Sequence, residues 1–491
     1  MKHINKLYLL IIILLSTVVC HGADLEKMYQ PYYKQLDKVR ENKQEELVRY
    51  LKRVESVAKS IGSDSEMKDL FIMKRHLYNQ TKTAAMTQEQ KDIQQFLRNS
   101  IIDRYMDRYL VFYDLLFIDE AGDIFYTNRR QGDYRKNIFK GKLAKTALSK
   151  HLKNDSKYSF VDYQNFEVSA EPSAFFMVPF VMNGKKLGWF VLQFAVNRID
   201  DMFSIESNLG RTGEVFLVNE DQYMLTDSRF TAESTILKKH LSSDNILPKF
   251  KEKSGHKLVV DYRGFRALSS FNVISVLGSK WLIIAKIDED EVLTSEYKKM
   301  SNRKQNIFIK DTINSINIKK VEKYILKKDI EVDMDEFKRA TNGQTLYTHG
   351  VSTCTALIFS LKEKFAYMAH MSGYDKIYGG DGTDLLNHIM KRIDEFDAVR
   401  NEKRLIKVYI VSPNVNYDKN IIDALLRWGL MLSQINIIVN PQAKYADISH
   451  DYTTQKTLIN WNVQMKKVKY GMDMDDVHSL AEYYYRTRAS N

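Results

Sequence analysis

Helical periodicity over residues 24–108 limits the folds open to this chain. The segment is polar and charged, with apolar residues at helical spacing and almost no proline. Apolar side chains that recur every three or four residues form one stripe on a helix, and another surface has to cover that stripe. The run LEKMYQPYYKQLDKVRENKQEELVRYLKRVESVAKSI therefore predicts a long amphipathic helix that packs along the segment after it. The same stripe also suits the seam of a coiled-coil homodimer.

From Leu110 the sequence changes to short apolar runs separated by turn residues. The stretch YDLLFIDEAGDIFYT predicts strand, turn and strand, and further strand runs follow up to residue 290. Two pieces between them, KGKLAKTALSKHL and RIDDMFSIE, have helical character. A hydrophobic fraction of 44% with 12% aromatic residues is ample for packed cores. We therefore expect two successive small antiparallel sheets in this region.

The stretch TLYTHGVSTCTALIFSLKEKFAYMAHMS contains Cys354, one of two cysteines in 491 residues. TALIFS and FAYMAHM flank a charged break at Lys362–Lys364, a pattern that predicts a β-hairpin. If the turn is centred on Lys362, Cys354 and His370 lie at equal distances from the centre and face each other. Directly opposed residues have Cβ atoms about 4.5–5.5 Å apart, close enough for imidazole to activate a thiol. The competing interpretation is a small buried cysteine and a structural histidine.

Helices and strands alternate after this hairpin. DLLNHIMKRIDEF and IIDALLRWGLMLS predict helices, whereas KVYIVSPN and INIIVN predict buried strands, which together favour an α/β layered domain. The motif GGDGT at residues 379–383 is shared with nucleotide-handling kinases, but no hydrophobic strand precedes it, so a loop that caps the next helix is favoured. The tail from Val463 is expected to be a docking helix or a solvated end.

The first residues suggest export. Lys2 and Lys6 precede an apolar run that ends at Cys20, the pattern of a secretory signal, with an uncleaved membrane anchor as the alternative. Removal of residues 1–23 would leave Cys354 as the sole thiol, which then has no internal disulfide partner. We expect a periplasmic or secreted protein, or one anchored in the inner membrane with its bulk outside the cytoplasm.

Charge and histidine spacing argue against two classes of partner. The formal charge of +12 comes from lysines spread over the whole chain, so it indicates a solvated surface and not a nucleic-acid site. No Cys/His pair has the spacing of metal ligands, and we expect neither a metal nor another cofactor.

Residues 24–290 closely resemble the double Cache sensor of bacterial chemoreceptors and sensor kinases. The resemblance is carried by EPSAFFMVPFV from Glu171, GRTGEVFLVNEDQYMLTDSRF from Gly210 and DYRGFRALSSFNV from Asp261. It implies PAS-like antiparallel sheets in two lobes and a small ligand, such as an amino acid or a carboxylate, in the first lobe. The matching pocket would lie near Tyr126, Tyr163, Phe175 and Phe176. Aromatic residues on such strands more often form the core, so no ligand residue is assigned.

Residues 326–491 resemble the chemoreceptor glutamine deamidases of the CheD type. The resemblance is carried by Thr348, Gly350, Cys354, the later Met-Ala-His that ends at His370, and the lead-in VDMDEFKRATNGQTLYTHG. It implies a thiol nucleophile at Cys354, a base at His370, an orienting role for Thr348 and a protein substrate that bears a target glutamine. Ser352 and Thr353 stand where glycine and serine are usual.

Taken in order, the chain is expected to comprise a leader (1–23), a double Cache sensor (24–290), a linker of helical character (291–325) and a CheD-like domain (326–491). The linker is too polar to span a membrane, so both domains would lie on the same side. The predicted fold is α+β, and the predicted function is a ligand sensor joined to a protein-glutamine deamidase. The alternative is a non-catalytic sensor whose second domain is an interaction module. An exported deamidase would act on an envelope or host protein.

Overall fold

The computed structural model describes residues 4–82, 85–101, 112–129, 132–154, 158–166, 172–204, 208–301, 304–305, 316–317, 323–372, 384–396, 402–413, 419–440 and 442–462, with side chains from Leu25 onward. Two compact units divide the chain between Leu293 and Thr294. The leader's side chains, the GGDGT motif and the tail from Val463 lie outside what is described. Among the described residues, no helix combines the length and the apolarity that a membrane crossing requires.

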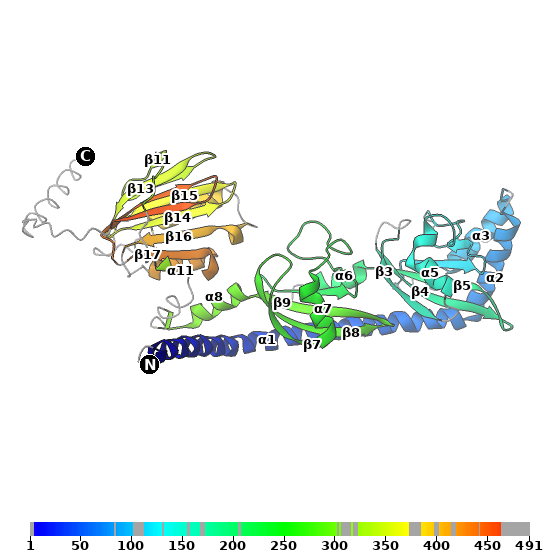
Figure 1. The fold of residues 1–491 in the computed structure, drawn as a ribbon. Coiled ribbons are helices and arrows are strands. Elements are labelled where there is room, and N and C mark those ends of the chain that lie inside the picture. The colour runs from blue at the N-terminus through cyan, green and yellow to red at the C-terminus, as the bar shows by residue number, and fades with distance from the viewer. Residues whose placement is uncertain are drawn as a thin grey trace, which may run out of the picture. The chain divides into compact units, whose positions relative to one another are not determined.

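Unit 1 (residues 1–293) begins with the predicted long helix. Its helices are α1 (Ile4–Ser63), α2 (Ser65–Gln80), α3 (Gln88–Ile101), α5 (Ala147–Asn154), α6 (Asn197–Ser204) and α7 (Ser243–Glu252), with a 3-10 turn η2 (Leu143–Lys145). Helix α8 (Glu289–Lys299) begins in unit 1 and continues past the boundary. Leu36, Leu47 and Val54 form the buried stripe of α1, which packs on β4, β8 and β9. In Figure 1 this helix (blue) runs along both sheets of the unit.

The first lobe of unit 1 is one antiparallel sheet in the order β2-β1-β5-β4-β3. Its strands are β1 (Asp114–Asp119), β2 (Ile124–Thr127), β3 (Ser159–Gln164), β4 (Ser173–Met182) and β5 (Lys185–Ala195). Because side chains alternate along a strand, Phe176 faces the helix-side core and Phe175 the opposite core. Both faces are therefore covered, and this explains why β1 is buried at every position.

The second lobe is a further antiparallel sheet in the order β6-β9-β8-β7. Its strands are β6 (Glu214–Asn219), β7 (Ser254–Val260), β8 (Arg266–Val276) and β9 (Ser279–Asp288). The prediction of a long N-terminal helix followed by two antiparallel sheets is confirmed.

Unit 2 (residues 294–491) contains two sheets. The larger has the order β10-β17-β16-β14-β15-β12 and the smaller the order β11-β13-β18-β19. Their strands are β10 (Ile316–Asn317), β11 (Ile330–Glu331), β12 (Glu336–Ala340), β13 (Thr345–Val351), β14 (Thr355–Leu361), β15 (Phe365–Met371), β16 (Lys407–Ser412), β17 (Ile435–Val439), β18 (Tyr445–Asp451) and β19 (Thr457–Asn462). The sequence analysis did not anticipate β18 and β19.

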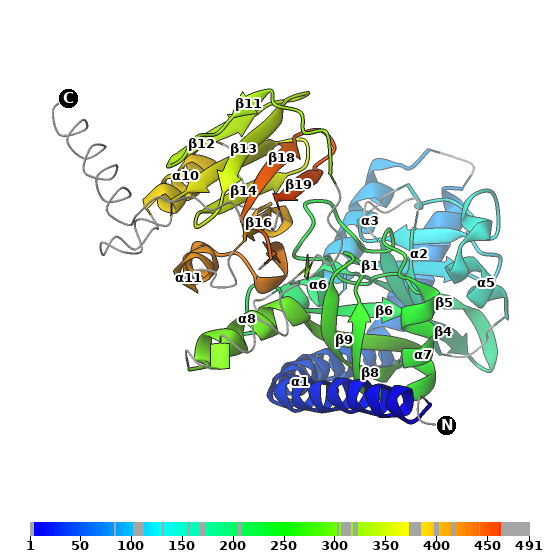
Figure 2. The same cartoon turned by 60° about the vertical axis from the view of Figure 1, so that its left-hand side comes forward.

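Helices cover one face of the larger sheet in unit 2, and the smaller sheet covers the other. The helical elements are α10 (Asp384–Phe396), α11 (Lys419–Trp428) and the 3-10 turns η4 (Lys403–Leu405) and η5 (Leu432–Gln434). Phe359 of β14 packs on Trp428 of α11, with ring centroids 6.1 Å apart. Ala356 and Ile358 of the same strand instead join the core that includes Leu346 and Ile448 of the smaller sheet. Figure 2 shows these three layers within the unit.

The hairpin of β14 and β15 forms, but its predicted register is wrong. Its turn is centred on Glu363, which takes a φ of +64°, and not on Lys362. His370 therefore lies opposite Ala356, and Cys354 precedes the first paired residue of β14. Moving the turn centre by one residue shifts the pairing register by two residues. Because side chains alternate between the two faces of a sheet, Cys354 still belongs to the same face as His370.

Candidate functional site

The three residues singled out in the sequence lie in or next to the layer between the two sheets of unit 2. Thr348 is on β13 in the smaller sheet, whereas His370 is on β15 in the larger one. Cys354 ends the connection from β13 to β14 and belongs to the same buried core as Val351 and Ala356. Their relative solvent exposures are 0% for Thr348, 3% for His370 and 4% for Cys354.

A hydrogen-bond chain orients the imidazole of His370. The Thr348 hydroxyl donates to the carbonyl oxygen of Val332 over 2.8 Å, and Thr348 Oγ1 lies 2.8 Å from His370 Nδ1. A hydroxyl has a single proton, so Thr348 Oγ1 has to accept from Nδ1–H. The neutral ring is then protonated on Nδ1, which leaves Nε2 with the lone pair of a base.

His370 Nε2 is buried and has no hydrogen-bond partner among the described residues. Burial lowers the pKa of His370 below its usual value, the neighbouring charge of His349 lowers it further, and Asp335 and Asp333 oppose this. The ring is therefore biased toward the neutral form, which can accept a proton.

Cys354 lies just below the surface. Ser352 and Thr353, which precede it, are exposed, and its own carbonyl accepts from Ser412 Oγ at 3.3 Å. The register places Cys354 diagonally from His370, and diagonal Cβ atoms in a sheet are typically about 7–8 Å apart. In this state the thiol does not hydrogen-bond to Nε2.

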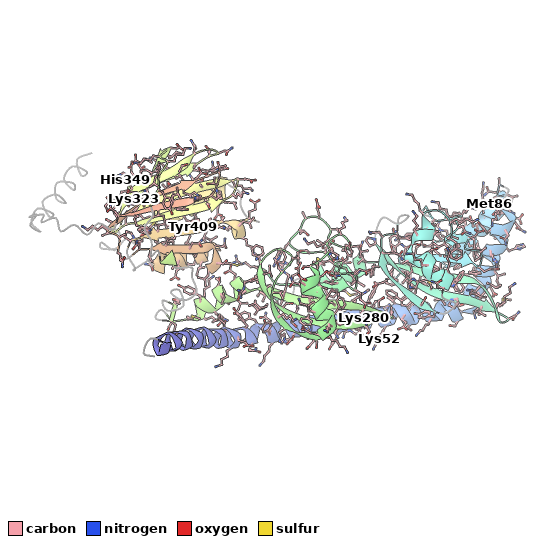
Figure 3. All side chains as sticks on the ribbon, in the orientation of Figure 1. Lys52, Met86, Lys280, Lys323, His349 and Tyr409 are labelled. Carbon is pink, nitrogen blue, oxygen red and sulfur yellow. The ribbon has the colours of Figure 1, made fainter. Side chains whose placement is uncertain are left out.

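Gly350 lies near the end of β13, where the pairing with β18 is irregular, just before the connection that leads to Cys354. This residue takes a φ of +66°, and its N–H donates to Asp447 Oδ1 of β18 at 3.0 Å. The sequence analysis missed this anchor because β18 was not foreseen. A neighbouring cavity of about 540 Å³ is lined by Tyr347, His349, Gly350, Ser352 and Asp447, among others. Figure 3 labels His349, whose side chain is 59% exposed and pairs with Glu331.

Unit 2 also contains a second buried histidine–threonine pair, which sequence reasoning passed over. His450 Nδ1 lies 2.9 Å from Thr457 Oγ1, and burial lowers the pKa of His450 to about 4. His450 lies opposite Leu346 in the pairing of β13 with β18, whereas Thr348 lies opposite Ile448. Because His450 belongs to the smaller sheet and has no place in the β14–β15 hairpin, it is a natural control for the chemistry of His370.

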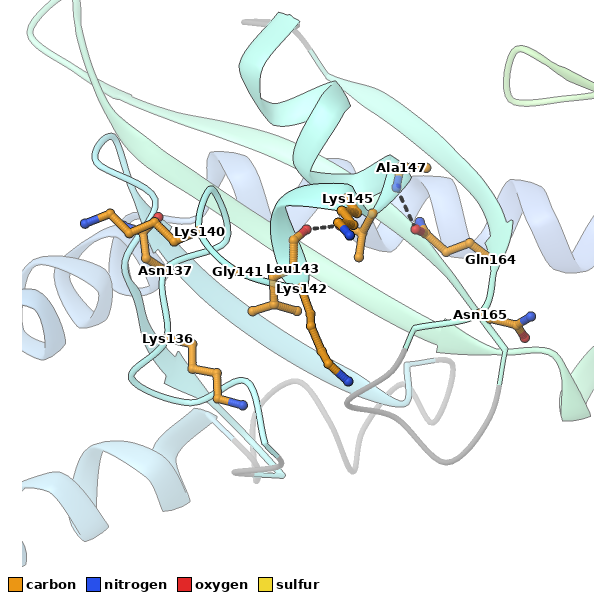
Figure 4. Close-up of a pocket in the computed structure, with 11 residues that line it drawn as sticks. Lys136, Asn137, Lys140, Gly141, Lys142, Leu143, Lys145, Ala147, Gln164 and Asn165 are labelled. Carbon is orange, nitrogen blue, oxygen red and sulfur yellow. Dashed lines mark hydrogen bonds between the residues drawn. The ribbon is translucent and has the colours of Figure 1, made fainter.

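Unit 1 has a separate cavity of about 960 Å³ in its first lobe. Lys136, Lys140, Lys142 and Lys145 line it, and Gln164 lies at its edge, where its Oε1 accepts from the Ala147 N–H (Figure 4). Gln164 Nε2 is buried without a hydrogen-bond partner among the described residues. The lining offers mostly donors and positive charge.

The aromatic residues considered for a ligand pocket in the first lobe are core residues instead. The four side chains are at most 6% exposed; they are Tyr126, Tyr163, Phe175 and Phe176. Tyr163 packs on Trp281, and Phe175 packs on Phe166. Within the described ranges, no group of three or more His, Cys, Asp or Glu side chains is placed to hold a metal ion.

No protein-family model and no curated protein matches this chain. Among solved structures, the chain is similar to the periplasmic sensory domain of the Campylobacter jejuni chemoreceptor Tlp1, with 12% identity, a TM-score of 0.39, and 54% of this chain and 98% of that chain covered. It is similar to the ligand-binding domain of the Pseudomonas aeruginosa amino acid chemoreceptor PctB in complex with L-Arg, with 15% identity, a TM-score of 0.34, and 54% and 97% covered. The match to an extracellular ligand binding receptor from Desulfohalobium retbaense has 12% identity and a TM-score of 0.36, and covers 51% of this chain but 40% of that chain. The solved structures to which the chain is similar thus include a ligand-binding domain and a periplasmic sensory domain of chemoreceptors.

Proposed function

We propose that unit 2 is a cysteine amidohydrolase that converts a glutamine side chain of a protein to glutamate, with Cys354 as nucleophile and His370 as base. The observation that carries this proposal is the chain from Val332 through Thr348 to His370, which leaves a buried, unpartnered Nε2 on the face to which Cys354 belongs. The choice of glutamine rests on the resemblance to the CheD-type deamidases.

The reaction begins with transfer of the Cys354 thiol proton to His370 Nε2. The thiolate then attacks the carboxamide carbon, and the C–S bond forms as the carbonyl electrons move to oxygen. When the tetrahedral adduct collapses, the C–N bond breaks and ammonia leaves with the proton from the imidazolium. Water, deprotonated by Nε2, hydrolyses the thioester, which releases glutamate and restores the thiol.

The turn before Cys354 supplies the donors for the oxyanion. The Gly350 N–H donates to Asp447 Oδ1, so it is not one of the oxyanion donors. The N–H groups of Ser352, Thr353 and Cys354 have no acceptor among the described residues. Each oxyanion donor is worth on the order of 3 kcal/mol in the transition state. Closure of the thiol onto Nε2 accompanies substrate binding, because catalytic hydrogen bonds are often long in the free enzyme.

The test is mass spectrometry for Gln-to-Glu conversion in envelope proteins incubated with the purified chain, together with release of ammonia. We expect conversion by the wild type and none by Cys354→Ala or His370→Gln. His450→Gln is the matched control, since it removes a buried histidine with its own threonine partner and should leave the activity intact. Conversion that persists in Cys354→Ala, or thiol alkylation of ordinary rate that His370→Gln does not change, would overturn the proposal.

A second function is carried by the cavity of unit 1. We infer that the first lobe binds a small anionic molecule, such as a carboxylate, because four lysines and the unpartnered Gln164 amide line the cavity. The protein then acts as an exported sensor whose ligand state is linked to unit 2. Thermal-shift screening of small carboxylates and amino acids tests this inference, with Lys140→Glu paired with Lys142→Glu as the cavity variant. A ligand that stabilises the wild type and the double variant equally would contradict it.

A further inference from the structure

Asp335 contacts the strand end that carries His370, and the proposed chemistry gives it no role. Its N–H donates to the carbonyl oxygen of His370 over 2.6 Å. Its Oδ1 accepts the N–H of Ser372 at 2.9 Å. Asp335 therefore holds the two peptide units that flank Met371, directly after His370.

The backbone of Asp335 is adapted to this contact. It takes a φ of +59°, a left-handed conformation that costs most side chains about 1 kcal/mol and that Asp and Asn tolerate best. Met334 forms an isolated bridge with His370, and Glu336 is its partner in the ladder of β12 and β15. Asp335 thus lies between two residues that both pair with His370. Backbone strain that the surrounding structure maintains often marks a functional site.

The charges around His370 are unequal. Asp335 and Asp333, on the connection between β11 and β12, favour its protonated form, whereas His349 on β13 disfavours it. Glu336, its ladder partner, is engaged by Lys338 at 3.1 Å. Of the two aspartates, Asp335 has the stronger effect on the pKa of His370.

We propose that Asp335 is a positioning residue for His370, which fixes the end of β15 and stabilises the imidazolium that forms when Cys354 loses its proton. The catalytic role of Asp335 rests on the proposed function. Its effect on the position and protonation of His370 does not. The effect passes through His370, and Asp335 itself does not contact the reacting atoms.

The experiment is an NMR titration of His370 in the full chain with ¹³C-labelled histidine, at low and high salt. Asp335→Asn keeps an acceptor for Ser372 and tolerates the left-handed backbone, so it removes the charge alone. At a fixed acidic pH, we expect the ratio of imidazolium to imidazole at His370 to fall about two- to fourfold, and less at high salt. Glu363→Gln removes an exposed carboxylate from the same hairpin and should leave the ratio unchanged.

Activity provides the second readout. The acid limb of the pH–rate profile should move to lower pH in Asp335→Asn, because loss of the Asp335 charge lowers the pKa of His370 and the imidazole then stays neutral in more acidic solution. Asp335→Ala should lower kcat as well, since the Ser372 contact is lost with the charge. An unchanged His370 titration in Asp335→Asn, or an equal change in Glu363→Gln, would overturn the inference. If the His370 titration shifts in Asp335→Asn but the wild-type protein deamidates no substrate, the proposed function is wrong and the effect of Asp335 on His370 is still supported.

Discussion

Trp281 of β9 donates its indole N–H to the carboxylate of Asp162 on β3, with distances of 2.9 and 3.1 Å to the two oxygens. Trp281 is fully buried, and its ring packs on Tyr163. The bond therefore joins the sheets of the two lobes inside unit 1. The proposed sensor function would need a contact of this kind between the lobes.

Trp281→Phe should loosen the contact between the lobes. The substitution keeps an aromatic ring but leaves the half-buried Asp162 carboxylate without its indole donor, which costs about 1–3 kcal/mol. Hydrogen-exchange mass spectrometry of β3 and β9 peptides measures this locally. Trp189→Phe is the matched control, because Trp189 Nε1 is buried without a partner among the described residues. Equal loss of protection in both variants would argue against the role of the bond.

The stability of unit 1 should fall as pH rises because of Asp114. Burial, reinforced by the neighbouring Asp133, raises the pKa of Asp114 from its ordinary value of 3.8 to about 7. The folded state thus holds a proton that the unfolded state has lost, and the associated stabilisation is present below pH 4 and is lost as pH approaches 7. Asp114→Asn should remove this dependence. Between pH 5 and pH 8 the wild type should lose on the order of 2 kcal/mol relative to the variant.

Hydrogen exchange of β1 peptides at both pH values, corrected for intrinsic exchange, measures that difference. Asp64→Asn is a suitable control because Asp64 caps α2 near the surface and its side-chain bonds suit either residue. Parallel pH dependence in the wild type and Asp114→Asn would show that Asp114 titrates normally.

Thr348→Val should impair the proposed reaction with little loss of fold. Valine matches threonine in shape but cannot accept from His370 Nδ1, so the proton is free to occupy Nε2 and the base is lost in that tautomer. We expect kcat to fall roughly 10- to 1000-fold, with KM nearly unchanged. Thr348→Ser retains the hydroxyl and should recover most of the rate. Thr457→Val, at the other histidine–threonine pair, should have no effect on turnover.

Gly350→Ala should affect the turn before the thiol. The added Cβ would meet nothing within 4 Å, so the cost comes from the φ of +66° and is about 1 kcal/mol. Gly343 has a φ of +81° and equally open surroundings, and it lies in the turn between β12 and β13. Both alanine variants should lose similar stability by thermal unfolding. Deamidation should decline in Gly350→Ala alone, and an equal decline in Gly343→Ala would indicate a general loss of folding.

Much of the fold follows from patterns in the sequence. The helical stripe of residues 24–108 led to α1, α2 and α3, and the alternating runs after Leu110 led to the two antiparallel sheets. The helices α10 and α11 and the strands β16 and β17 lie where their apolar runs predicted them. These elements have strong local signals, because the spacing of apolar residues along the sequence follows the period of the helix or strand whose face is buried.

The sequence by itself determined many of the elements and the residues of the candidate site, because Thr348, Cys354 and His370 stand in a recognisable pattern. Only the tertiary structure decided their pairing. A period-two pattern is unchanged by a register shift of two residues, so apolar alternation could not distinguish Ala356 from Cys354 as the residue opposite His370. That choice depended on which turn residue adopts a left-handed conformation, and it is Glu363. Contacts between residues far apart in the sequence leave no local signal, because the partners are adjacent only in space; examples are Val332 with Thr348, Asp447 with Gly350 and Asp335 with His370.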